Sequence, residues 1–505
     1  MKTALYHGAK RMTVLSLMLL ATAVSGCSSD KFTRLGETEK ALGTDSLTAQ
    51  RQHRVVHDPN GFGFHFPGVL VAIEKAPAKT SDGTPSMVGH ARWLEASDPA
   101  YACEQKSKRC LNTKHPDMRD NKDWLDKHLT DPKATFVSHI VRYGLDANSS
   151  IPRIRGTFDY NIYTNTSNDT AFNKGWDALL GLEAELNALA AEINATHILF
   201  YSIGWNTDQQ EAIQNYNSLI GNLIEAAAAD KTKNKLEFRP LVIGLSWPSF
   251  WDGPAAALPP LSYVNKANDA DETALLWGNL LLNKVIKNVK DERKLPVVVL
   301  GHSFGARLTT TATFAYPLLS ESSSANEPST TPDLVIGLEG AFSINRLHQT
   351  WKDDNSKVAN STLGFKDFRN VKAQFAYVGS FYDTALTISK WAPFVGEPKV
   401  YDNYERNYGD HIARAYITCE GQWSTVKLPQ VKDPKTVCPD TKASEQPAPP
   451  STALPALDPS KILLVDASRV IRHNQPCTGG GAHSDVYSPE VANLVWDFIR
   501  VLEKR

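Results

Sequence analysis

The sequence predicts an α/β fold in which a mostly parallel central sheet carries helices on both faces. Through the last two thirds of the 505-residue chain, short apolar runs rich in β-branched residues alternate with stretches of helical periodicity. The runs occupy residues 197–201, 241–245, 297–300, 334–338, 371–378 and 462–465. Strands that are apolar at every position are typical of a parallel sheet buried on both sides, and the helices between them supply the crossovers.

Helical patterns separate these runs. They are predicted at residues 176–193, 213–224 and 272–289, from residue 306 onward, and at 488–502. The last is the clearest, because Ser488 is a plausible N-cap, Pro489 suits the first helical position, and apolar residues then form one stripe.

Composition divides the chain into segments of different character. Residues 1–27 form a signal sequence, 28–60 a polar tether, 61–169 an N-terminal extension with the first strands of the main sheet, and 170–505 the main domain. Within that domain, residues 393–460 are expected to be an insertion without strands. Seven prolines in residues 431–460 indicate a rigid loop, which is either a lid over the site or a disulfide-pinned surface loop.

The N-terminus has the pattern of an export signal. Basic residues precede an apolar run of 13 residues, 12–24, which is too short to span a bilayer. The run ends in Val24-Ser25-Gly26-Cys27, which resembles the bacterial lipobox, where cleavage precedes a cysteine that is then lipidated. The resemblance implies a lipid-anchored protein of the bacterial cell envelope, and Ser28 in place of Asp favours the outer membrane. A plain signal peptide is the alternative.

Charge and cysteine content exclude several classes of protein. Lys and Arg number 54 against 55 Asp and Glu, so the chain lacks the basic character that nucleic-acid binding requires. Six cysteines are too few for a disulfide scaffold, and no C-x-x-C or H-E-x-x-H spacing indicates a metal. We therefore expect no metal and no cofactor. With Cys27 lipidated, the obvious disulfide pairs are Cys103 with Cys110 and Cys419 with Cys438, which leaves Cys477 over.

One motif carries chemistry. The apolar run 297–300 leads directly into Gly301-His302-Ser303-Phe304-Gly305, and a helical pattern follows. G-x-S-x-G between a strand and a helix is the pattern of a nucleophile elbow, a sharp turn that lifts the serine hydroxyl from the sheet edge. We predict that Ser303 is a nucleophile, with a structural turn serine as the alternative.

Around this motif, residues 170–505 resemble the alpha/beta-hydrolase superfamily, including bacterial members with "VHGYN" and "SWPS" stretches. The matching stretches here are Ser202-Ile203-Gly204-Trp205-Asn206 and Ser246-Trp247-Pro248-Ser249. The resemblance implies an oxyanion hole formed by the backbone N–H groups of Trp205 and Phe304. Ile203 replaces the family's histidine, a departure that removes no main-chain donor. A simple strand-to-helix turn is the alternative.

A serine nucleophile needs a base and an orienting acid, which follow it in this superfamily in the order Ser, acid, His. His483 lies in a glycine-rich loop directly before the last helix, and we prefer it to His473, expected to be a surface residue. Asp383 follows a strand where the family places its acid. Glu339, after the preceding strand, is the rival, and Asp383 could instead cap a helix.

The expected activity is that of a membrane-anchored serine hydrolase acting on carboxylic esters, either small molecules or lipids. A lipase, phospholipase or amidase would use the same groups. A non-catalytic envelope lipoprotein that retains the fold is the alternative from another class. Three aromatic residues after the 241–245 run could line a substrate pocket or belong to the core: Trp247, Phe250 and Trp251.

Overall fold

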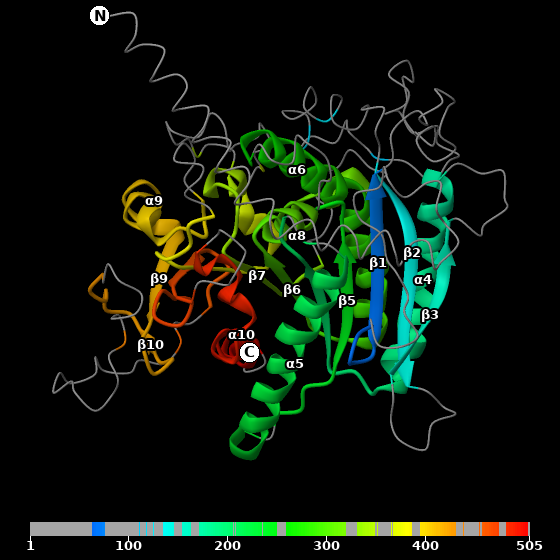
Figure 1. Ribbon diagram of the computed structural model, residues 1–505, viewed down its shortest axis with the longest axis horizontal. Coiled ribbons are helices and arrows are strands. Elements are labelled where there is room, and N and C mark those ends of the chain that lie inside the picture. The colour runs from blue at the N-terminus through cyan, green and yellow to red at the C-terminus, as the bar shows by residue number, and fades with distance from the viewer. Residues whose placement is uncertain are drawn as a thin grey trace, which may run out of the picture.

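An 11-stranded mixed sheet runs through the part of the chain that the computed structural model describes (Figure 1). The described residues are 63–75, 111, 118, 125, 135–145, 154–162, 171–205, 207, 209–234, 236–249, 259–319, 331–348, 351, 365, 367–385, 394–430, 438, 454, 457–473 and 481–502. The strands are β1 (Gly68–Lys75), β2 (Thr135–Leu145), β3 (Ile154–Asn161), β4 (His197–Ser202), β5 (Pro240–Ser246), β6 (Val297–His302), β7 (Leu334–Leu338), β8 (Gln374–Gly379), β9 (Ile412–Ile417), β10 (Trp423–Ser424) and β11 (Ile462–Asp466). Their order is β10-β9-β11-β8-β7-β6-β4-β5-β1-β2-β3.

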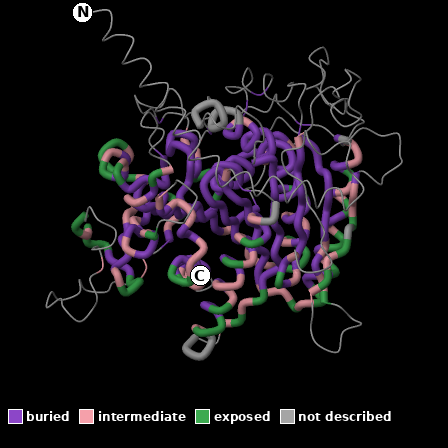
Figure 2. Tube along the Cα trace, in the orientation of Figure 1, coloured by how far each residue is buried: buried purple, intermediate pink, exposed green. Residues whose placement is uncertain are grey.

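The centre of this sheet is parallel. All neighbouring strands from β9 through β11, β8, β7, β6, β4 and β5 to β1 pair in parallel. Only the pairs β1/β2, β2/β3 and β9/β10 are antiparallel. Every residue of β4, β5, β6, β7 and β8 is buried, as expected for strands covered on both faces (Figure 2). The predicted α/β fold with a mostly parallel sheet is confirmed.

Helices cover the sheet in two groups. The helix α5 (Gln209–Asn234) packs against α10 (Pro489–Leu502), in front of the sheet in Figure 1. The other group comprises α4 (Ala171–Glu192), α6 (Pro259–Thr273), α7 (Lys287–Arg293) and α8 (Phe304–Phe314), with π-helical turns at Ala274–Gly278 and Leu281–Ile286 joining α6 to α7. Among the described residues, none of these helices is both long and apolar enough to cross a membrane.

The segment 393–460 differs from the sequence-based expectation. It was expected to contain no strands, but it contributes α9 (Tyr401–Tyr408), β9 and β10, and β9 pairs with β11. The strand escapes a search for apolar runs because its sequence, IARAYI, has Arg414 at its centre, where the guanidinium pairs with Glu405 of α9. Cys419, just after β9, forms a disulfide with Cys438.

Several residues singled out by sequence lie outside the described residues. They are Cys27, Cys103, Cys110, Phe250, Trp251 and Cys477.

Buried ion pairs attach α6 to the rest of the fold. Asp271 of α6 accepts two hydrogen bonds from Arg307 of α8, at 2.9 and 2.6 Å, and two from Arg346, at 2.7 and 2.8 Å. All three side chains are at most 4% exposed. Asp269 of the same helix pairs with Lys75 of β1 at 2.7 Å. The helix that follows Ser303 is thus held to α6 by charge as well as by apolar contacts.

We predict that Asp271→Asn destabilises the fold by about 3–5 kcal/mol, because it leaves two buried guanidinium groups without a counter-charge. The matched control is Asp291→Asn, which removes the acid of an exposed pair with Lys287 and should cost no more than about 1 kcal/mol. Equilibrium unfolding in urea measures both. Equal small losses would contradict a structural role for the Asp271 cluster.

Candidate active site

The turn at Ser303 has the strained geometry of a nucleophile elbow. Ser303 directly follows β6 and adopts φ 55° and ψ −120°, a conformation that non-glycine residues rarely occupy. Its N–H donates to the Leu338 carbonyl at 2.9 Å, and its own carbonyl accepts from Ala306 and Ala341. These bonds on both sides of the turn hold the backbone in place while the following residue begins α8.

The flanking glycines are required by packing. A Cβ at position 301 would lie 2.4 Å from the Ala306 Cα, across the turn. A Cβ at position 305 would lie 2.2 Å from the Ser202 carbonyl oxygen and 2.4 Å from that of Ile203. The elbow therefore packs directly on the end of β4 and the loop after it.

Two of the three predicted residues are joined by a hydrogen bond. Asp383, 1% exposed and just beyond β8, accepts a hydrogen bond of 2.7 Å on Oδ2 from His483 Nδ1. Its Oδ1 accepts from the Ala385 N–H at 2.9 Å. Since a carboxylate only accepts, Nδ1 of His483 carries the proton, and Nε2 is left as the basic nitrogen. Asp383, and not Glu339, is the acid bonded to His483.

Within the described residues, no hydrogen bond joins the Ser303 hydroxyl to His483. The two are linked through His302, whose Nε2–H donates to the His483 carbonyl at 2.9 Å. The His302 and His483 rings lie 4.7 Å apart between centroids. Bonds between a nucleophile and its base are often long in the absence of substrate, so this arrangement is compatible with a catalytic pair.

His302 is a functional candidate that the sequence analysis did not identify. Its Nε2 donates to a carbonyl, so in the neutral ring Nδ1 is the acceptor, and the Tyr487 hydroxyl donates to it at 2.9 Å. Burial is the main cause that holds the pKa of His302 well below its usual value, and the nearby His483 adds to it. The ring is therefore neutral. Its position next to Ser303 in the Gly301–Gly305 motif is the sequence feature that could have identified it.

The loop that carries His483 is held by backbone contacts. Gly481 has φ 60°, and a Cβ there would lie 2.4 Å from the Tyr382 carbonyl oxygen. That carbonyl accepts a hydrogen bond from the Ala482 N–H, so the loop pairs with the chain beside Asp383. At its other end, Asp485 accepts from the N–H groups of Arg472 and His473. His473 itself is exposed.

The expected oxyanion loop lies against Ser303. A Cβ at Gly204 would be 3.0 Å from the Ser303 Cβ, so the loop backbone approaches the serine closely. The Trp247 indole N–H donates to the Ile203 carbonyl at 2.8 Å, and the ring is fully buried. Trp247 thus supports the loop from below. Trp205 is half-buried and packs on Phe304, with 6.1 Å between ring centroids.

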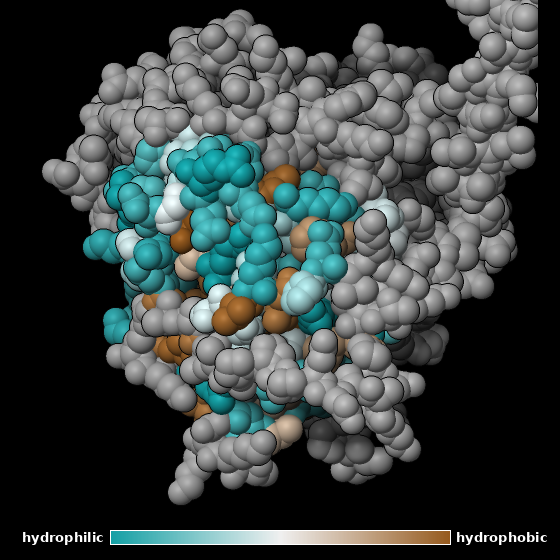
Figure 3. Space-filling view, turned by 90° about the vertical axis from the view of Figure 1, so that its left-hand side faces the viewer, coloured by the Kyte–Doolittle hydropathy of each residue, from teal (hydrophilic) through white to brown (hydrophobic). Residues whose placement is uncertain are grey.

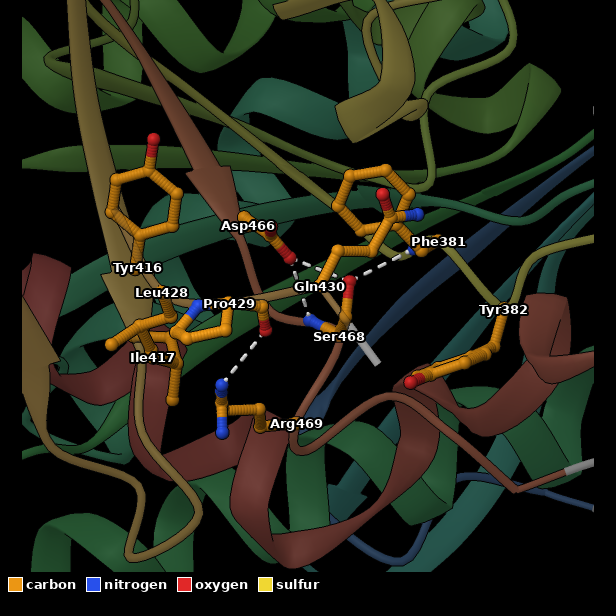
Figure 4. Close-up of a pocket in the computed structure, with 10 residues that line it drawn as sticks. All are labelled: Phe381, Tyr382, Tyr416, Ile417, Leu428, Pro429, Gln430, Asp466, Ser468 and Arg469. Carbon is orange, nitrogen blue, oxygen red and sulfur yellow. Dashed lines mark hydrogen bonds between the residues drawn. The ribbon is translucent and has the colours of Figure 1, made fainter. Parts of the chain in front are cut away.

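A small pocket opens beside the turn that follows β8 (Figure 4). It lies where β8, β9 and β11 end, and Asp466 and Ser468 form a hydrogen-bonded pair on its wall. Burial raises the pKa of the Asp466 carboxyl. The described surface on the side of α9 and β9 is mostly hydrophilic, with scattered apolar side chains (Figure 3). Among the described residues, no cluster of three or more His, Cys, Asp or Glu side chains could hold a metal.

Comparisons with known proteins add little. No protein-family model matches the chain, and no curated protein matches it. The structure is similar to the catalytic core domain of an acetyl xylan esterase from Trichoderma reesei, with 15% identity and a TM-score of 0.22 over 43% of this chain and 94% of that one. A likeness at this level carries no inference about function.

We predict that Gly305→Ala destabilises the protein by about 1–3 kcal/mol. The new Cβ would clash with the carbonyl oxygens of Ser202 and Ile203, and relieving the clash requires a shift of the backbone. The control is Gly221→Ala in α5, where a Cβ meets nothing within 4 Å and should stabilise by roughly 0.5–1 kcal/mol. Urea unfolding of both variants tests the contact. Stabilisation by both substitutions would show that the elbow does not pack on the loop as described.

Proposed function

We propose that the protein is a serine hydrolase that cleaves carboxylic esters, with Ser303 as nucleophile, His483 as base and Asp383 as orienting acid. The observation that carries the proposal is the 2.7 Å hydrogen bond between His483 and Asp383. It lies at the carboxyl edge of the sheet, where the strained turn at Ser303 also lies. The resemblance of the two flanking motifs to those of alpha/beta-hydrolases points to the same chemistry.

In this mechanism the Ser303 hydroxyl attacks the ester carbonyl carbon while Nε2 of His483 removes its proton. The tetrahedral intermediate carries its negative charge on the former carbonyl oxygen. The intermediate then collapses, His483 returns the proton to the departing alkoxide, and an acyl group remains on Ser303. Water, activated by His483 in turn, hydrolyses that ester and restores the free serine.

The oxyanion would be stabilised by the N–H groups of Trp205 and Phe304. Phe304 is the first residue of α8, whose N-terminal dipole favours negative charge. At Gly204 the loop after β4 lies close to Ser303, so that the Trp205 N–H would be the second donor. Each donor of this kind typically contributes about 10²–10³-fold to kcat.

Asp383 has the task of holding His483 in one tautomer. With Nδ1–H bonded to the carboxylate, Nε2 is free of its own proton and can accept that of the serine. Asp383 is 1% exposed, so water does not compete for this bond.

We predict that wild-type protein reacts with a fluorophosphonate probe and that Ser303→Ala abolishes the labelling. His483→Ala should lower kcat on an activated ester by at least about 10²-fold with little change in stability, because general-base assistance is lost. His473→Ala is the matched control and should stay within a few-fold of wild type, roughly, because that residue is exposed.

Failure of correctly folded wild-type protein to react with the probe or to hydrolyse esters would reject the hydrolase and favour a non-catalytic role. Equal losses in the two histidine variants would instead mean that both shape the site.

The proposal includes location. Cys27 would be lipidated after cleavage of the signal sequence, and several acyl chains at about 0.8 kcal/mol per buried CH₂ would hold the protein on the membrane. The ester substrate would then be a small molecule or a lipid reached from the envelope.

We predict that Cys27→Ala leaves the protein either unprocessed or, once cleaved as an ordinary secreted protein, soluble. Fractionation of cells expressing both forms, followed by immunoblotting, measures this. A processed variant that still sediments with membranes would show that another segment anchors the chain.

A further inference from the structure

Glu339, the rival acid of the sequence analysis, occupies a strained and enclosed position. It directly follows β7 and has φ 49°, in the left-handed region that residues other than glycine rarely adopt. Its side chain is fully buried. Its N–H donates to the Val378 carbonyl at 2.8 Å, and a Cβ at Gly396 would lie 2.8 Å from its Cα. Strain of this kind at a sheet edge is typical of functional positions.

The Glu339 carboxyl has few donors around it. Oε2 accepts from the Ser380 N–H at 3.3 Å, while Oε1 is buried and meets no N–H or O–H donor among the described residues. The same turn carries Asp383, whose N–H donates to the Ser380 carbonyl at 3.3 Å, and its carboxyl interacts electrostatically with that of Glu339. Two carboxyl groups can form a hydrogen bond only if one of them supplies a proton, and burial of two adjacent carboxylates without that proton is strongly unfavourable.

Of the two acids, Glu339 is the one placed to hold the proton. Both oxygens of Asp383 already accept hydrogen bonds, one from His483 Nδ1 and the other from the Ala385 N–H. Glu339 has one long backbone bond and no cation bonded to it among the described residues.

We propose that Glu339 is a neutral carboxylic acid that donates a hydrogen bond to Asp383 and thereby fixes the carboxylate that orients His483. It is a positioning residue, since it acts through Asp383. The kinetic consequence rests on the proposed function, but the proton on Glu339 does not.

The ionisable surroundings agree with this assignment. Burial first, and then the charge of Asp383, raise the pKa of Glu339 well above its usual range. The other ionisable groups that face it are Glu397 and Tyr401. Burial raises the pKa of Glu397 to about 7 and that of Tyr401 well above its ordinary value. Neither a carboxyl nor a phenol can carry a positive charge, so neither stabilises an ionised Glu339.

The test that does not depend on activity is proton linkage. An acid that is protonated in the fold and ionised in the unfolded chain takes up a proton on folding. Its contribution to stability is complete below its unfolded pKa, near 4.5, and is lost progressively as pH rises toward its folded pKa. Glu339→Gln removes this dependence, because the amide donates at every pH.

Urea unfolding of wild type and Glu339→Gln from pH 5.5 to 8.5 measures this pH dependence of stability. The unfolding constant of wild type should rise relative to that of the variant by about tenfold per pH unit until the pH reaches the folded pKa of Glu339. Glu397→Gln is the matched control, for which the relative change should level off near pH 7. Parallel curves for wild type and Glu339→Gln would overturn the proposal.

Kinetics then test the role. Glu339→Gln should keep kcat on an activated ester within about threefold, whereas Glu339→Ala, which has no donor, should lower kcat roughly 10- to 100-fold with KM little changed. Glutamine as damaging as alanine would overturn the positioning role. If wild type hydrolyses no ester, the proposed function fails, and the linkage experiment still decides whether Glu339 carries the proton.

Discussion

The strained turn at Ser303 is the constraint on which the rest of the site depends. A residue held at φ 55° and ψ −120° costs of the order of 1–3 kcal/mol, and such a conformation persists only where its surroundings over-determine it. Here the carbonyl of Leu338 and the N–H of Ala341, from the neighbouring strand and its loop, hold the turn from one side. Gly305 allows β4 and its loop to close on the other side. A parallel sheet with three adjacent strands ending at one edge is what makes both supports available.

The same edge collects the remaining groups. Asp383 follows β8, and the loop of His483 pairs with the chain beside Asp383, so the position of His483 is set largely by main-chain bonds. His302 then ties this loop back to the strand that carries the serine. Hydrogen bonds therefore connect the turn at Ser303, His483 and Asp383, and the backbone of each is fixed by main-chain bonds.

Glu339 illustrates how sequence reasoning and structure differ. From the sequence, Asp383 and Glu339 are alternatives, because each follows a strand at the edge where an orienting acid is expected. In the fold, the adjacent parallel strands β7 and β8 place both acids at the same edge of the sheet, and we propose that they act together rather than as alternatives. The strand β9 was also missed from the sequence. Arg414 interrupts its apolar pattern, and Glu405, the acid that it pairs with, lies on α9.

The sequence by itself determined the features that depend on near neighbours: the apolar strand runs, the G-x-S-x-G turn at Ser303 and the capped last helix. Each is encoded by residues within a few positions of one another, where periodicity and backbone sterics decide the outcome. Only the tertiary structure decided which distant side chains meet. Asp383 and His483 are 100 residues apart, and His302 is 181 residues from the carbonyl it bonds. Such contacts depend on strand order and loop path, which local patterns do not specify.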